Sequence, residues 1–238
     1  MQGDGLYSEG NDSLFDELKG VLGGKKIIEY QHIIWDWNGT LINDTWLVVE
    51  IINKMLARRN LQEVNQERHR DVFDFPVMKY YSTLGFDFSK ESFEKLTDEF
   101  ISEYYDRFNE CKLFDEAEGV LKKIGEKGIL QSVLSASKED LLKAKIKHYG
   151  IDKYFYNIIG LRNHYAESKI ERGKTWVAQL NLEARDVFLI GDTMHDYEVS
   201  RSIGCDCLLV ANGHHSYERL VSHGVKVIKT LQEISLKL

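Results

Sequence analysis

The sequence predicts a three-layer α/β protein, in which helices cover both faces of a parallel sheet and an all-helical cap is inserted into this core. From residue 116 onward, short apolar runs alternate with helix-like stretches joined by short links, a rhythm typical of such a sheet. Between residues 45 and 115, apolar residues instead recur with helical spacing, and no strand signal interrupts them. We therefore expect a core of residues 1–44 and 116–238, with 1–25 as an N-terminal extension, and a cap of residues 45–115.

The first strand is expected at Ile27–Asp36. Its apolar residues gather toward its end instead of alternating, as happens when both faces of a strand are buried. Asp36 is followed by a polar turn that contains Gly39, so the strand would deliver one carboxylate to the sheet edge where open α/β folds bind ligands. Before this strand, the apolar residues of Ser13–Leu22 favour a short helix that two glycines end.

Helical spacing runs through the expected cap. Asp44 is expected to cap a helix that ends near Asn60, with apolar residues along one side. The only proline of the chain, Pro76, stands where the first turn of a helix tolerates it. An aromatic stripe follows Ser89 in the last of these helices and is expected to pack against the others.

The second half of the chain supplies five further strands with helices between them. The strands are short apolar runs, and the helices are amphipathic. The expected strands are Ile129–Ser135, Tyr156–Leu161, Val187–Ile190, Cys207–Val210 and Val225–Ile228; the expected helices are Glu116–Gly125, Ser137–Gly150, Ile170–Leu180, Met194–Ile203, Ser216–Ser222 and Thr230–Leu238.

Composition narrows the functional classes. Hydrophobic residues make up 43% and charged residues 29% of the chain, an ordinary globular balance. The formal net charge of −7 argues against a nucleic-acid-binding protein that depends on a basic surface. The sequence has no apolar run of the roughly 18 residues that a membrane span needs. Residues 1–10 do not resemble a signal peptide, and three cysteines without framework spacing favour a reducing compartment. We expect a cytoplasmic monomer or homodimer.

Polar residues of a matched kind follow the expected strands or lie in the link after one of them. The carboxyl ends of parallel strands meet at the same edge of a sheet, so these side chains are expected to converge there. The set comprises Asp36, Asn38, Ser135, Lys169, Asp192 and Asp196.

This combination suits transfer of a phosphoryl group. The acids can hold a hard divalent cation such as Mg²⁺. Lys169 would offset the repulsion between an anionic nucleophile and an anionic substrate. The hydroxyl of Ser135 and the turn amides after Asp36 can hydrogen-bond the phosphate oxygens. Asp36 is then free to attack phosphorus and form an aspartyl phosphate.

The segment Asp36-Trp37-Asn38-Gly39-Thr40-Leu41 resembles the first motif of the haloacid dehalogenase superfamily of phosphotransferases. Ser135 resembles its second motif, Lys169 its third, and Gly191-Asp192-Thr193-Met194-His195-Asp196 its fourth, in the same order. The resemblance extends over residues 30–230. The helical insertion is similar to the small cap of the phosphoglycolate phosphatase-like branch, which implies a Rossmann-like core.

The resemblance implies a Mg²⁺-dependent phosphatase, a phosphoric monoester hydrolase, that acts on a small phosphorylated metabolite. Asp36 would be the nucleophile. The implied metal ligands are Asp36, the backbone carbonyl of Asn38, Asp192 and Asp196. The implied catalytic residues are Asp36, Asn38, Ser135 and Lys169, and phosphate binding would fall to Gly39, Thr40, Ser135, Ala136 and Lys169.

Two features depart from the family pattern. Phosphatases of the family usually carry a second aspartate where this chain has Asn38. An amide has no titrating proton near neutral pH, so Asn38 predicts a slow phosphatase, another proton donor such as His195, or a different main task. The segment around Lys169 lacks the usual prolines, which leaves Lys174 as a second candidate; the distance to Asp192 favours Lys169.

Two other functions remain open from the sequence. Asp36 could attack carbon, as in the dehalogenases of the superfamily, which need no metal. The chain could also be a non-enzymatic regulatory module that binds phosphate and metal. Three side chains that begin a cap helix, Phe75, Lys79 and Tyr80, either pack or reach over the site, and His214-His215 is expected in a solvent-facing loop.

Overall fold

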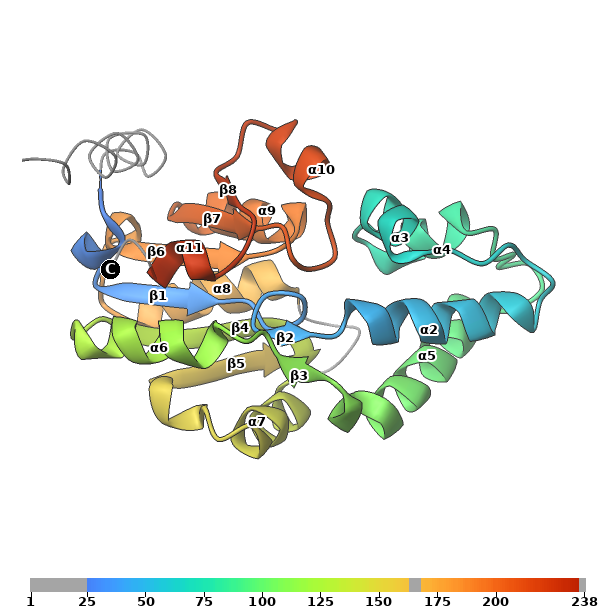
Figure 1. Ribbon diagram of the computed structural model, residues 1–238, viewed down its shortest axis with the longest axis horizontal. Coiled ribbons are helices and arrows are strands. Elements are labelled where there is room, and N and C mark those ends of the chain that lie inside the picture. The colour runs from blue at the N-terminus through green and yellow to red at the C-terminus, as the bar shows by residue number, and fades with distance from the viewer. Residues whose placement is uncertain (1–24, 163–167, 236–238) are drawn as a thin grey trace, which may run out of the picture.

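The computed structural model describes residues 25–162 and 168–235, so the helix expected at Ser13–Leu22 lies outside the described residues. Six parallel strands form one sheet in the order β5-β4-β1-β6-β7-β8 (Figure 1). They are β1 His32–Trp35, β4 Leu130–Lys138, β5 Asn157–Leu161, β6 Val187–Gly191, β7 Asp206–Val210 and β8 Val227–Ile228. The predicted three-layer α/β fold is confirmed.

Helices cover both faces of this sheet (Figure 1). Side chains alternate along β1, so Ile33 enters one apolar layer and Ile34 the other. The layer with Ile33 contains α6 (Ala117–Glu126), α7 (Glu139–His148) and α11 (Gln232–Ser235); the layer with Ile34 contains α8 (Lys169–Gln179) and α9 (Met194–Ile203). The remaining core elements are α10 (Tyr217–Val221) and the 3-10 helices Ile27–Glu29, Asp152–Tyr154 and Ala184–Asp186. Across the described chain, each helix is too short or too polar to span a bilayer.

The first strand is shorter than expected. Residues Ile27–Glu29 form a 3-10 helix, and β1 begins only at His32. The carboxylate of Glu29 accepts a hydrogen bond from the backbone amide of Lys26 (2.5 Å), which closes a turn at this point. A local side-chain contact therefore overrides the apolar run that predicted strand.

Four helices, which we call the cap, lie to one side of the sheet (Figure 1). They are α2 (Thr45–Ala57), α3 (Gln66–Val72), α4 (Val77–Thr83) and α5 (Phe93–Arg107), followed by the 3-10 helix Phe108–Glu110. The chain enters and leaves the cap through two antiparallel strands, β2 (Ile42–Asn43) and β3 (Lys112–Leu113). The expectation that residues 45–115 contain only helices is therefore wrong at β3. Two residues are too few to leave a readable alternation, so only their pairing with β2 reveals the strand.

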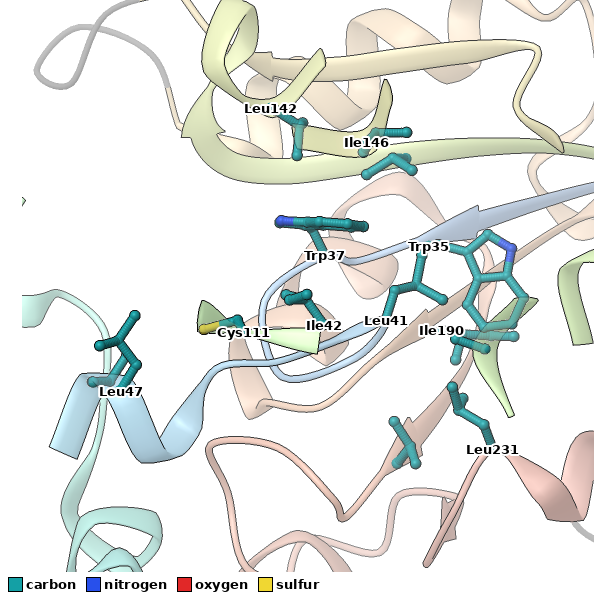
Figure 2. Close-up of a cluster of buried hydrophobic side chains, with 14 of the residues drawn as sticks. Trp35, Trp37, Leu41, Ile42, Leu47, Cys111, Leu142, Ile146, Ile190 and Leu231 are labelled. Atoms are coloured by element: carbon teal, nitrogen blue, oxygen red, sulfur yellow. The ribbon is translucent and has the colours of Figure 1, made fainter. Parts of the chain in front are cut away.

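The loop after β1 is anchored by its own apolar side chains. Trp37, Leu41 and Ile42 are fully buried. Figure 2 shows them in one cluster with Leu142 of α7. Burial of a large apolar side chain contributes about 1.5–3 kcal/mol, so three of them hold this short loop firmly. The loop in turn fixes the position of Asp36 at the sheet edge.

Candidate active site

Asp36 stands directly after β1 at the carboxyl edge of the sheet. Its backbone amide donates to the carbonyl of Ile190 in β6 (2.8 Å), so the pairing of the two strands continues up to this residue. The residue is 7% exposed. Because β4 and β6 flank β1, the residues at their ends lie beside Asp36 and complete the site.

Three carboxylates meet at this edge. Asp36, Asp192 after β6, and Asp196 in the first turn of α9 each offer one oxygen, and these oxygens all lie within 4.8 Å of one another. Thr193 orients the third carboxylate, since its amide (3.0 Å) and its hydroxyl (2.7 Å) both donate to Asp196 Oδ2. A Cβ on Gly191 would lie 2.3 Å from the Asp196 carboxyl carbon, so this approach of side chain to backbone requires glycine.

Lys169 lies between two of these carboxylates. It is the first residue of α8 and is 5% exposed. Its ammonium donates to Asp36 and to Asp196, the latter at 2.5 Å. Lys174 is exposed and pairs with Glu171 at 3.3 Å. The geometry therefore favours Lys169 over Lys174 as the lysine of the site.

Strand β4 carries Ser135 and Ala136 to the same edge. Ser135 is 1% exposed, and its Oγ accepts a hydrogen bond from the amide of Ser137 (3.1 Å). That bond uses a lone pair of the hydroxyl and not its proton, which can be donated elsewhere. Ala136 is exposed beside it. A hydroxyl donor thus lies on the strand adjacent to β1, as the sequence predicts.

Gly39 and Thr40 brace the carboxylates from the turn after β1. Gly39 has a φ of 71°, and its amide donates to Asp44 Oδ1 (2.9 Å). The Thr40 hydroxyl lies 3.3 Å from Asp36 Oδ2 and 3.1 Å from Asp192 Oδ1. Both groups thus hydrogen-bond buried acids of the protein, and the part of Gly39 and Thr40 in binding phosphate stays a prediction.

Burial and charge set the protonation of the acid cluster. Burial raises the pKa of Asp36 to about 6, although Lys169 opposes the shift. Burial raises the pKa of Asp192 well above its ordinary value, even though His214 opposes this. For Asp196, Lys169 outweighs burial and lowers the pKa. The cluster therefore holds more buried negative charge than its lysine compensates.

This surplus of negative charge fits a hard divalent cation. If all three carboxylates were ionised, the Lys169 ammonium alone would leave two negative charges uncompensated, and the raised pKa values of Asp36 and Asp192 reflect this cost together with burial. Carboxylate oxygens are the ligands that Mg²⁺ prefers, and it usually keeps several waters besides one or two carboxylates. The residues present are therefore suited to a magnesium ion held by Asp36, Asp192 and Asp196.

The side chain of Asn38 links the core to the cap. Its Nδ2 donates to Asp44 Oδ2 (2.7 Å) and to the Tyr104 hydroxyl on α5 (2.6 Å). Its Oδ1 accepts a hydrogen bond from the Ser137 hydroxyl (3.0 Å). Both amide protons and the carbonyl of this side chain are thus engaged by the protein.

Asp44 and His214 form a buried ion pair that the sequence analysis missed. They are 1% and 5% exposed, and His214 Nε2 lies 3.3 Å from Asp44 Oδ1. His214 outweighs burial and lowers the pKa of Asp44, and Asp44 outweighs burial and raises the pKa of His214. The His214 amide also donates to Asp192 Oδ2 (2.6 Å), which ties the pair to the acid cluster.

Two expectations for residues near the site are wrong, and a further candidate, His195, lies against the cap. His214 and His215 are both buried, so the solvent-facing loop expected for them is wrong. The side chain of Asp44 makes no capping bond to α2, although it stands at the N-cap position. His195 stacks on Phe75 of the cap, with ring centroids 4.7 Å apart. His214 could have been predicted as a site residue from its position after β7, because the carboxyl end of that strand lies at the same edge of the sheet as Asp36.

Comparisons with known proteins agree with this geometry. Residues 33–210 match the family of haloacid dehalogenase-like hydrolases. A relative named pyrophosphatase PpaX, from Caldanaerobacter subterraneus, is 24% identical over 177 residues, 72% of this chain and 77% of the relative. The N-acetylmuramic acid 6-phosphate phosphatase of Pseudomonas putida is 25% identical over 186 residues, 76% of this chain and 83% of the relative. A solved haloacid dehalogenase-like family hydrolase from Streptococcus pneumoniae has a TM-score of 0.75 at 16% identity and covers 88% of this chain and 99% of that one.

The chain belongs to the haloacid dehalogenase-like hydrolase family, because the family match spans most of its length. The resemblance inferred from the four motifs is confirmed. Together with relatives that are named as phosphatases, this membership makes the chain an enzyme, a hydrolase of the phosphatase type.

Proposed function

We propose that the protein is a Mg²⁺-dependent phosphatase that hydrolyses a small phosphomonoester through an aspartyl phosphate on Asp36. The observation that carries this proposal is the placement of the Asp36 carboxylate within the acid cluster and against Lys169. A nucleophilic carboxylate, a cationic side chain and a set of oxygen ligands are the three components that transfer of a phosphoryl group to an aspartate requires.

In the first step, one oxygen of Asp36 attacks phosphorus in line with the ester oxygen. The bond from phosphorus to the ester oxygen breaks, and the leaving alkoxide takes up a proton from water. Lys169 offsets the charge of the phosphoryl oxygens, and Ser135 is placed to donate to one of them. Water then attacks phosphorus, the bond to Asp36 breaks, and inorganic phosphate leaves while the carboxylate is restored.

The metal and the proton donor are separate parts of the proposal. Bound Mg²⁺, held by Asp36, Asp192 and Asp196 with the carbonyl of Asn38, would supply further positive charge at the phosphoryl group. Asn38 supplies no proton, because a side-chain amide does not titrate near neutral pH. Proton transfer by a positioned side chain typically accelerates a reaction by roughly 10²–10⁴, so the proposal includes slow turnover.

The alternatives have less support. Attack of Asp36 on carbon needs no metal, and the two further buried acids beside the nucleophile, Asp192 and Asp196, would then serve no purpose. The relatives named as a pyrophosphatase and a sugar-acid phosphate phosphatase instead favour a small phosphorylated metabolite as substrate. We also propose a cytoplasmic location, where such metabolites occur.

Phosphate release from a panel of phosphomonoesters, with Mg²⁺ and with a chelator, tests the proposal. We expect release that depends on the metal and is abolished by Asp36→Asn. Asp98→Asn, an exposed cap residue, is the matched control and should retain the full rate. Acid-quenched protein should carry one phosphoryl group on the peptide that contains Asp36. Full activity of Asp36→Asn, or turnover unaffected by the chelator, would refute the proposal.

A further inference from the structure

The cap contacts the core at the loop that follows β7. Figure 1 shows α3 and α4 facing the segment between β7 and α10. Two neighbouring residues of α3 contact the loop residues nearest the site: His69 Nε2 lies 3.0 Å from His214 Nδ1, and Arg70 Nε donates to the carbonyl of Gly213 (2.9 Å). Farther from the site, Asp71 accepts from the Ser216 hydroxyl (3.1 Å), and Arg219 donates to backbone carbonyls of α3. The bond from His69 is to the His214 side chain, which contacts Asp44, whereas the bond from Arg70 is to a backbone carbonyl.

His69 begins a buried line of hydrogen bonds. Its Nδ1 lies 2.7 Å from the hydroxyl of Tyr80 on α4, and its Nε2 faces His214. His69 is 0% exposed and Tyr80 is 1% exposed. Both ring nitrogens of His69 and both of His214 are engaged, so neither ring can rotate without losing a buried hydrogen bond.

The line ends on residues of the site. His214 Nε2 reaches Asp44 Oδ1 (3.3 Å), and Asp44 in turn accepts from Asn38 Nδ2 (2.7 Å) and from the Gly39 amide (2.9 Å). The His214 amide holds Asp192 at 2.6 Å. A shift of the His214 ring would therefore disturb Asp44 and, through it, the turn after Asp36.

We infer that His69, a residue of the cap, is a positioning residue for the active site, which acts through His214 on Asp44 and hence on Asn38 and Gly39. Resting on the function proposed above, this inference assigns the cap a part in the chemical step besides covering substrate. The physical reason is distance: misplacement of reacting groups by about 1 Å can lower a rate by roughly a hundredfold. His69 touches no reacting atom itself.

Three variants test the inference through kcat and KM. His69→Phe keeps the ring volume but removes both ring nitrogens, and we expect kcat to fall about tenfold or more with KM changed less than threefold. His69→Gln can offer an amide oxygen to His214, and we expect kcat within about threefold of wild type. Arg70→Gln removes the neighbouring contact between cap and core and serves as the matched control, with kcat within about twofold.

Imidazole ¹⁵N spectra of His214 report its hydrogen bond to His69 directly, and the Arg70→Gln control shows what loss of a neighbouring cap contact does to them. We expect its Nδ1 hydrogen-bond signature in wild type, His69→Gln and Arg70→Gln, and its loss in His69→Phe. Should His69→Phe not fold, Tyr80→Phe, which releases only the far nitrogen of His69, should lower kcat in the same sense.

Two results would overturn the inference. One is wild-type kcat in His69→Phe, and the other is an equal fall of kcat in His69→Phe and Arg70→Gln. If the wild-type protein releases no phosphate from any substrate of the panel, the proposed function fails instead. The spectra of His214 still decide in that case whether His69 holds this ring.

Discussion

Replacing Asn38 by aspartate would restore the acid that related phosphatases carry, yet the structure predicts little gain. Asn38 Nδ2 donates to Asp44 Oδ2 at 2.7 Å, and Asp44 is buried and ionised beside His214. An aspartate at position 38 would place a second carboxylate against the first. Charge centres roughly 4 Å apart interact by about 4 kcal/mol at an effective dielectric constant of 20, which corresponds to about 3 pKa units.

The carboxyl group introduced by Asn38→Asp would therefore have a pKa near 7 in the folded protein and about 4 in the unfolded chain. Its folded pKa is raised, so wild type and variant should be equally stable near pH 4. The free energy of unfolding of the variant should then fall by about 3 kcal/mol, relative to wild type, as the pH rises from 4 to 7. Urea titrations followed by tryptophan fluorescence measure this difference.

The rate of the Asn38→Asp variant should reflect the same contact. The proton that the new carboxyl group keeps is donated to Asp44 and is not directed at a leaving group, so we expect kcat at pH 7 to rise less than tenfold. A carboxylic acid that could donate its proton to the leaving group would raise kcat by roughly 10²–10⁴. In the double variant with Asp44→Asn, the pH-dependent loss of stability should vanish. A hundredfold gain of kcat in the single variant, with unchanged dependence of stability on pH, would refute the reasoning.

Two further predictions concern charge at buried sites. Lys169→Met should lower kcat by roughly a hundredfold, because the phosphoryl oxygens lose a cationic partner. The same variant should bind Mg²⁺ more tightly in calorimetry, because the acids lose a competing cation. Weaker binding would contradict the assignment of the acid cluster as the metal site. Burial lowers the pKa of His32 to about 4, so its contribution to the free energy of unfolding, present above pH 6.5, should fall by about 3 kcal/mol toward pH 4. His32→Gln should lack this part of the loss in urea titrations, and an identical pH dependence in both proteins would count against the assignment.

Much of the candidate site could be predicted from local sequence. An apolar run that ends at an acid predicts a strand that delivers a carboxylate, and parallel strands present their ends at one edge, so Asp36, Ser135 and Asp192 could be placed together without coordinates. Identification of the lysine of the site needed more than the ends of the strands. Lys169 and Lys174 both lie near the start of one helix. The distance to Asp192 in the sequence favours Lys169, and the packing of α8 against α9 shows that Lys169 is buried and Lys174 exposed.

The network around Asn38 was decided by tertiary structure alone. Asp44 reads locally as a helix cap and His214 as part of a polar loop, since each residue by itself has an ordinary role in such a segment. The turn after β1 and the loop after β7 bring them together, although they lie 170 residues apart in the chain. Their mutual charge makes burial of both tolerable. The sequence therefore determined that a carboxylate, that of Asp36, stands at the end of β1, because local pattern controls strand ends. The hydrogen-bond partners of the Asn38 side chain, two residues after Asp36, followed only from the fold, because long-range contacts leave no local pattern in the sequence.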